Sequence, residues 1–114
     1  MKRIASHFLI LSPDIIYKKQ VIEIDQQRLI QIFPLEEEME SVSWMSGVIF
    51  LSSQKMNLNE IKKKLKKAIN KNLIVFLSEY TSNIEIGNPV YAYFFNSVDL
   101  STFLILNETS IEEL

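Results

Sequence analysis

The side chains that could do chemistry in this chain are few and scattered. Its 114 residues include one histidine, His7, and no cysteine. A hydrolytic metal site needs several histidine and carboxylate ligands together, and Ser/His/Asp catalysis would have to use His7 as its base. No feature of the sequence marks a serine that would pair with His7. We expect His7 to be a structural residue of a strand, and we predict no catalytic, cofactor-binding or metal-binding residue.

The acidic run Glu36–Glu38, followed by Glu40, is the other set that could act as paired carboxylates. Neighbouring acids without burial or a fixed partner have no reason to change their pKa, so we interpret the run as a solvated connection. A glycine-rich phosphate loop is also missing, because Gly47 and Gly87 are the chain's 2 glycines. The sequence therefore predicts a protein that is not an enzyme.

Lysines gather in the segment with the clearest helical periodicity. Its apolar stripe consists of Leu58, Ile61, Leu65, Ala68 and Ile69. The lysines of a possible anion-binding patch are Lys62, Lys63, Lys66 and Lys67. Such a patch could bind nucleic acid or acidic lipid. The segment has no arginine and no interleaved aromatic ring for base stacking, so we favour a solvated helix face and keep anion binding as the alternative function.

The composition indicates a single soluble domain. With 47% apolar and 23% charged residues, the chain has an ordinary globular composition, and its length suits one core. The longest apolar stretch, 90–106, is interrupted by polar residues, whereas a membrane span needs about 20 mostly apolar residues. We predict one β-rich domain over residues 1–114, cytoplasmic, without a membrane segment, disulfide or cofactor.

Alternating apolar and polar residues predict strands over most of the chain. The expected strands are 3–11, 15–24, 28–33, 42–51, 73–78, 90–95 and 102–106. The second and third of them form a hairpin across 25–27. One amphipathic helix begins near Asn57 and ends near Asn72, and 108–114 is a helical or frayed tail. The predicted class is mainly β (α+β), a small β-sandwich or half-barrel with one packed helix.

Two stretches carry motifs of a known family. In the first, residues 3–51, a Gly-aliphatic strand begins at Gly47 and is followed by Leu51, Ser52 and Ser53. In the second, residues 84–114, the positions that match are Gly87, Pro89, Asp99, Leu100 and Leu114. These stretches resemble the N- and C-terminal ends of the metal-dependent amidohydrolases, in the deaminase and chlorohydrolase branch.

The resemblance implies the family's fold without its activity. In these enzymes the two ends form a small β domain, the composite domain, beside a (β/α)8 barrel of about 250 residues. This chain would be that domain without the barrel. The family's Pro-Gly-aromatic turn and His-x-His metal motif have no counterpart. Val90 replaces an expected glycine, and Glu112 and Glu113 stand where basic residues are usual. No position matches a metal ligand.

The apolar side chains of the late strands suggest a contact surface. In the family the composite domain leans on the barrel, so a domain without the barrel has an apolar face that something else must cover. The residues of this possible interaction surface are Tyr91, Tyr93, Phe95, Phe103 and Ile105. We therefore expect a non-catalytic protein that acts through contact with another protein, either as a homodimer, the simplest arrangement, or with an unknown partner.

Overall fold

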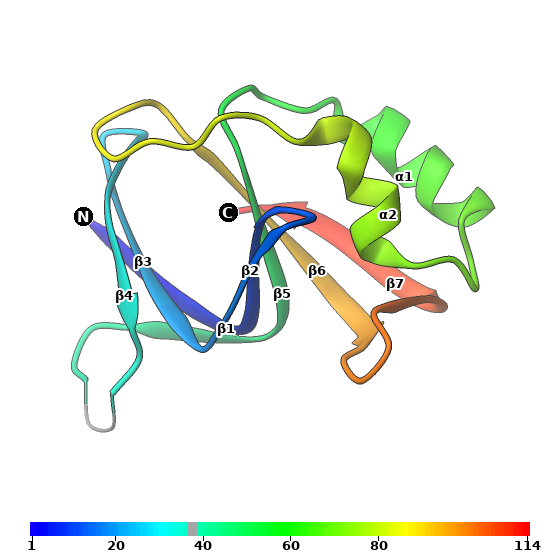
Figure 1. The fold of residues 1–114 in the computed structure, drawn as a ribbon, viewed down its shortest axis with the longest axis horizontal. Coiled ribbons are helices and arrows are strands. Elements are labelled where there is room, and N and C mark those ends of the chain that lie inside the picture. The colour runs from blue at the N-terminus through cyan, green and yellow to red at the C-terminus, as the bar shows by residue number, and fades with distance from the viewer. Residues whose placement is uncertain (37–38) are drawn as a thin grey trace.

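The fold is mainly β, of the α+β class, with one mixed, open, seven-stranded sheet and two short helices (Figure 1). The computed structural model describes residues 1–36 and 39–114. The strand order is β4-β3-β1-β5-β6-β7, and β2 pairs with β1 outside this path. The strands are β1 Lys2–Ser12, β2 Ile15–Lys18, β3 Gln20–Asp25, β4 Arg28–Pro34, β5 Ser43–Ser52, β6 Tyr91–Asp99 and β7 Leu104–Glu113. The predicted class, mainly β (α+β), is confirmed, but the described strands form one open sheet and not the two packed sheets of a sandwich.

The first half of the chain forms an antiparallel meander. β1 pairs with β2 and β3, and β3 pairs with β4, whereas β1 and β5 run parallel. Lys19 has a φ of 49° and separates β2 from β3, so the strand expected at 15–24 is two strands. The expected hairpin is confirmed. Its turn residues Gln26 and Gln27 have φ values of 50° and 63°, as a type I′ turn requires.

The sheet curls until β4 approaches the segment that precedes β6. Arg28 and Pro89 form an isolated bridge, and the Leu29 N–H donates to the Asn88 carbonyl at 3.0 Å. Gly87, with a φ of 88°, donates its N–H back to the Leu29 carbonyl at 2.6 Å. The left part of Figure 1 shows this curled half. Its interior is filled by Ile4, Leu9, Ile22, Ile24, Leu29, Ile49, Leu51, Val90, Ala92 and Phe94.

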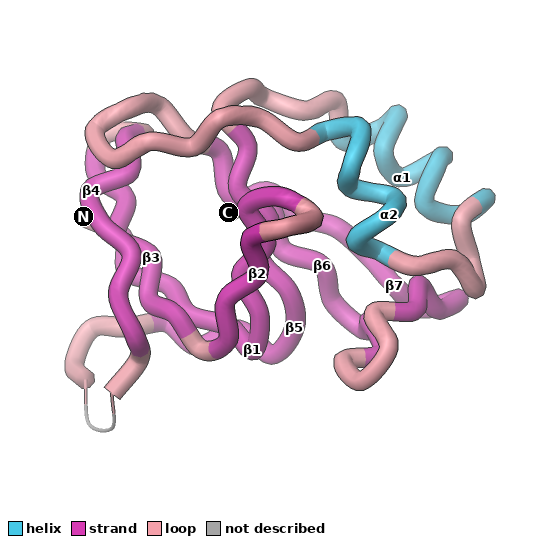
Figure 2. Tube along the Cα trace, viewed as in Figure 1, coloured by secondary structure: helices cyan, strands magenta, loops and turns pink. Residues whose placement is uncertain are grey.

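The helices form a layer over the other end of the sheet, away from β3 and β4 (Figure 2). α1 spans Leu58–Lys67, so it begins where predicted but ends before Asn72. Its N-cap Asn57 accepts the Glu60 N–H at 3.2 Å. α2 spans Leu73–Leu77 and continues into a 3-10 turn, η1, at Ser78–Tyr80. The core beneath the helices includes Phe50, Ile61, Leu65, Leu73, Leu77, Tyr93, Phe95, Ile105 and Ile111. Within the described ranges, no helix has the length and apolar content to cross a bilayer.

The strand predicted at 73–78 is wrong, because this run is helix α2 followed by the start of η1. The Asn72 Oδ1 accepts the N–H groups of Ile74 and Val75 at 2.8 and 3.2 Å and so caps the helix. Leu73 and Leu77, four residues apart, face the core. An uninterrupted apolar run has no period that separates a buried strand from a short helix. The described residues thus form two packed helices rather than the one expected.

The tail predicted at 108–114 as helical or frayed is also wrong. Most of it belongs to β7, where Ile111 opposes Phe95 and Ser110 opposes Asn96. The register shifts between Asn96 and Val98, where the Thr109 hydroxyl donates to the Ser97 carbonyl at 2.7 Å. Pairing with β6 therefore overrides the weak local preference of this polar segment. The acidic run at 36–40 falls partly outside the described residues, because Glu37 and Glu38 are not among them.

Candidate interaction surface

His7 packs against an aromatic ring. Its ring lies edge-on to Trp44, with 4.9 Å between centroids and an interplanar angle of 73°. The Trp44 Nε1 donates to the Ser46 hydroxyl at 3.2 Å. The His7 Nδ1 is buried and has no hydrogen-bond partner among the described residues. Within residues 1–36 and 39–114, no three His, Asp or Glu side chains lie close enough together to hold a metal ion. The contact with Trp44 is that of a packed structural side chain.

The late-strand residues expected to form an interaction surface lie mostly inside the molecule. Tyr93, Phe95 and Ile105 are each 0% exposed and belong to the core beneath the helices. Tyr91 and Phe103 are half-buried against the same core, and Phe103 meets Phe8 edge-on at 4.7 Å. The expected surface is therefore wrong for the three buried residues. The physical reason is that α1 and α2 cover the face that we expected a second chain to cover.

Tyr93 also bonds to the backbone just before α1 begins. Its hydroxyl accepts the Met56 N–H at 2.7 Å, one residue before the N-cap of the helix. Burial raises the pKa of the Tyr93 hydroxyl, so this group stays neutral. The largest aromatic side chain of the core thus fixes where the helix begins, which is a structural role.

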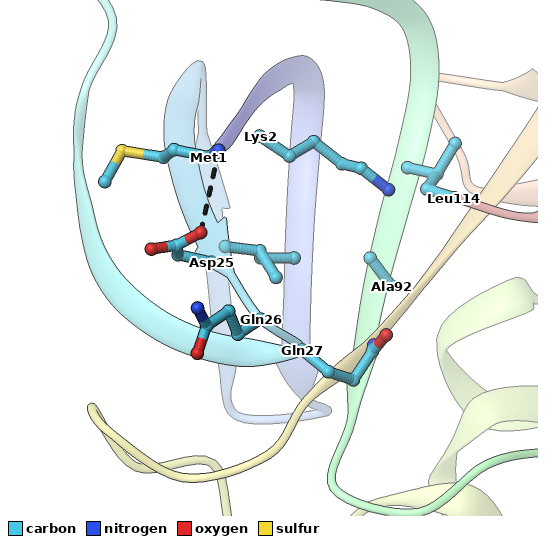
Figure 3. Close-up of a pocket in the computed structure, with 8 residues that line it drawn as sticks. Met1, Lys2, Asp25, Gln26, Gln27, Ala92 and Leu114 are labelled. Atoms are coloured by element: carbon cyan, nitrogen blue, oxygen red, sulfur yellow. Dashed lines mark ion pairs between the residues drawn. The ribbon is translucent and has the colours of Figure 1, made fainter.

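A crevice of about 310 Å³ opens at the end of the curled half of the sheet (Figure 3). It is lined by Met1, Lys2, Ile24, Asp25, Gln26, Gln27, Ala92 and Leu114. The Met1 ammonium lies 3.6 Å from the Asp25 carboxylate, and the Gln27 Nε2 donates to the Val90 carbonyl at 2.6 Å. These polar groups already bond to other groups of the same chain, so we assign the crevice a structural role where the fold closes.

The lysines of α1 form a basic face on a helix whose other side is fixed in the core. Ile61 and Leu65 are buried, and the four lysines of the predicted patch occupy positions around the rest of the helix. All four are exposed: Lys62, Lys63, Lys66 and Lys67. Among the described residues, none of these four forms an ion pair. The structure therefore brings together the residues that sequence analysis selected as a possible anion patch.

Lys64 differs from the other lysines because it has partners. Its ammonium donates to the Tyr80 hydroxyl at 3.2 Å, lies 3.4 Å from the Glu60 carboxylate and sits 5.6 Å from the centre of the Tyr80 ring. The hydrogen bond to Tyr80 is the main reason why the pKa of Lys64 is raised. The Lys64 side chain links α1 to η1, and its charge is partly neutralised by Glu60 within the same chain.

Two grooves flank α1. One lies between α1 and β7, has a volume of about 240 Å³ and is lined by Lys62, Leu65, Lys66, Ile69, Leu106, Asn107, Thr109, Ser110 and Ile111. The other lies between α1 and α2, has a volume of about 270 Å³ and is lined by Lys64, Lys67, Ala68, Lys71, Asn72, Val75, Phe76 and Glu79. Both grooves combine apolar side chains with lysines at the rim.

Val75 is the residue of this surface that sequence analysis missed. It is 70% exposed, the highest value among the large hydrophobic side chains. The sequence places Val75 in the predicted strand 73–78. The signal that could have located it is the Asn72 cap together with Leu73 and Leu77, four residues apart, which leaves position 75 on the outer side of a short helix.

No family model, curated protein or solved structure matches this chain.

Proposed function

We propose that this protein is a non-catalytic β domain, a barrel-less relative of the amidohydrolases, that acts through contact with another protein. The contact is made by the outer sides of α1 and α2, which we call the helical face. Its residues are Lys62, Lys63, Lys64, Lys66, Lys67, Lys71 and Val75. The observation that carries the proposal is an exposed apolar side chain, 70% accessible, beside a row of exposed lysines. Protein interfaces combine an apolar centre with a polar rim in this way.

The chemistry of α1 favours a protein partner over nucleic acid or membrane. The helix has no arginine to pair with phosphates bidentately and no aromatic ring to stack on bases. Its apolar side chains Ile61 and Leu65 are buried in the core, so they are not available for insertion into lipid. A protein partner has apolar side chains that would fill the groove beside the lysines.

The proposed absence of catalysis is supported by the position of the single histidine. His7 is a residue of β1 that packs against Trp44, and it is not among the residues that line the crevice or the two grooves beside α1. A general base must reach the proton that it abstracts, and the grooves beside α1 are lined by residues other than His7.

We propose a separate partner rather than a second copy of the chain. The sequence predicts a homodimer because of the apolar side chains of the late strands. In the structure, Tyr93, Phe95 and Ile105 among these side chains are covered by the chain's own helices. Two copies of the helical face would also bring like charges together, which disfavours their direct pairing.

Anion binding is the second candidate function. The observation that favours it is that Lys62, Lys63, Lys66 and Lys67 are exposed and form no ion pair within the described ranges. Phosphates of nucleic acid or acidic lipid headgroups would be the ligands, and their binding would weaken steeply with salt.

Retention of proteins from a nuclease-treated cell extract tests the proposal. The immobilised protein is compared with Lys63→Glu/Lys67→Glu and with Lys2→Glu/Lys18→Glu, which changes the net charge equally but away from α1. We expect one discrete protein to be held by the native and Lys2/Lys18 forms and lost from the Lys63/Lys67 form. Equal retention by all three would contradict the proposal. Binding only to nucleic acid or to anionic vesicles would favour the second candidate instead.

A further inference from the structure

We propose that the groove between α1 and α2 binds an acidic segment of the partner in which one aliphatic side chain is flanked by carboxylates. This inference rests on the proposed function and adds the place and the chemistry of recognition. The aliphatic side chain would occupy the apolar floor, and the carboxylates would pair with the lysines at the rim.

The floor of the groove is apolar and already formed. It consists of Ala68 from α1 together with Val75 and Phe76 from α2. Val75 is 70% exposed, whereas Ala68 is 6% exposed and Phe76 is half-buried. Covering Val75 with an aliphatic side chain would remove apolar surface from water, and that removal is favourable.

α2 is held in place, so the floor does not have to be assembled on binding. Leu73 and Leu77 anchor the helix in the core at 0% and 1% exposure. The Asn72 side chain caps it and also donates its Nδ2 to the Thr102 carbonyl at 3.2 Å. Preorganisation of this kind lowers the entropic cost of association.

The rim supplies positive charge at a defined side of the groove. Lys67 and Lys71 are exposed and, among the described residues, neither is paired with an acidic side chain. Lys64 is engaged with Glu60 and Tyr80. Glu79 is the acidic side chain among the groove residues. The partner's carboxylates are therefore expected beside Lys67 and Lys71 rather than beside Glu79.

This arrangement selects an acidic peptide over other anions. A phosphate backbone would satisfy Lys67 and Lys71 but would leave Val75 and Phe76 uncovered. An aliphatic segment without acids would cover Val75 but would lack partners for the lysines. Only a ligand with both features uses the apolar floor and the basic rim together.

Fluorescence anisotropy with a synthetic peptide tests the inference. The probe is a short labelled peptide with one leucine flanked by glutamates, and its matched control has serine in place of the leucine. The protein variants are Val75→Ser, Lys67→Glu/Lys71→Glu, and Lys2→Glu/Lys18→Glu as the charge control. Thermal unfolding of each variant confirms that it is folded.

We expect the leucine peptide to bind more tightly than the serine peptide, and Val75→Ser to remove that difference. Reversal of the charges at Lys67 and Lys71 should weaken binding by about tenfold, since each exposed ion pair contributes modestly and two are reversed. The Lys2/Lys18 form should bind as the native protein does. Equal binding of both peptides, or equal weakening by both charge variants, would overturn the inference.

The two proposals can fail separately. If the extract partner is still lost from the Lys63/Lys67 form while neither peptide binds, the groove inference is wrong and protein contact through α1 stands. If short nucleic acids bind and the peptides do not, the occupant is a phosphate chain and the inference is also wrong. If no partner depends on the lysines and no peptide binds, both proposals are wrong.

Discussion

Gly47 shows how closely the strands of the sheet approach one another. A Cβ atom at this position would lie 2.5 Å from the Phe95 carbonyl oxygen and 2.8 Å from a ring carbon of Phe94. The Phe95 carbonyl is backbone and the Phe94 side chain is buried in the core, so neither group can move far. Packing against β6 therefore explains the glycine at position 47 without any appeal to a family resemblance.

Gly47→Ala should destabilise the protein by about 1–3 kcal/mol, because overpacking in a rigid core forces the backbone apart. The measurement is the free energy of unfolding in urea. Ser46→Ala, at the neighbouring exposed position of the same strand, serves as the control and should have a small effect. If Gly47→Ala were as stable as the native protein, the close approach of β5 and β6 would be contradicted.

Asp99 gives stability a defined dependence on pH. Its carboxylate accepts the Ser101 hydroxyl at 2.7 Å and the Ser101 N–H at 2.9 Å, and these bonds lower its pKa below the ordinary value of 3.8. A lowered folded-state pKa means that the charged form stabilises the fold above about pH 3.8. That contribution is lost as the pH falls through the lowered value.

Asp99→Asn should therefore be less stable than the native protein at neutral pH, and the difference should shrink as the pH falls below the ordinary pKa of aspartate. Denaturation midpoints measured from neutral to acidic pH provide the test. Glu112→Gln removes one charge from an exposed position of β7 and is the control. A difference between Asp99→Asn and native protein that does not change with pH would contradict the role of the charge.

At the scale of elements, α2 depends on a single cap. Asn72→Ala removes the acceptor of the Ile74 and Val75 N–H groups and should cost about 1 kcal/mol in the free energy of unfolding. Asn72→Asp keeps an oxygen at the cap but loses the Nδ2 donor to the Thr102 carbonyl, so it should restore part of the loss. If Asn72→Ala had no effect, the capping role would be contradicted.

The sequence predicts the elements that carry a clear period. The hairpin β3–β4 is visible because Ile22 and Ile24 flank Glu23, and Ile30 and Ile32 flank Gln31. The same period predicts the wrong face for β4, because the structure buries Leu29 and exposes Ile30. α1 is visible from its stripe and from the Asn57 cap. The run 73–77 is entirely apolar, so it has no period, and its helical state depends on Asn72 and on the core beneath it. The same holds for β7, where pairing with β6 decides the structure.

At the scale of the molecule, the distribution of apolar surface could not be predicted from the sequence. The curled sheet joins Arg28 to Pro89, and this pairing between distant segments closes one core. The helices close the other core over Tyr93 and Phe95. A count of apolar residues along the chain cannot show where they lie, and only the fold shows that β1, β5 and β6 contribute side chains to both cores. The lysines, in contrast, follow directly from the helical period of α1.

Light scattering coupled to size exclusion should show a monomer at low and high protein concentration and at both low and high salt. The reason is that Tyr93, Phe95 and Ile105, three of the five late-strand side chains expected to drive self-association, are inside the chain's own core. Binding of a hydrophobic dye should also be weak. A stable dimer that is insensitive to salt would contradict this account of the apolar surface.

Site-specific photo-crosslinking tests most directly whether the helical face is the contact surface. A photoreactive residue is placed at position 67 on α1 or, as the control, at position 18 on β2, both of which are exposed lysines in the native protein. In cells that make the protein, we predict a discrete, protease-sensitive adduct from position 67 and none from position 18. A nuclease-sensitive adduct, or the same adducts from both positions, would contradict the claim that this protein acts through protein contact at α1.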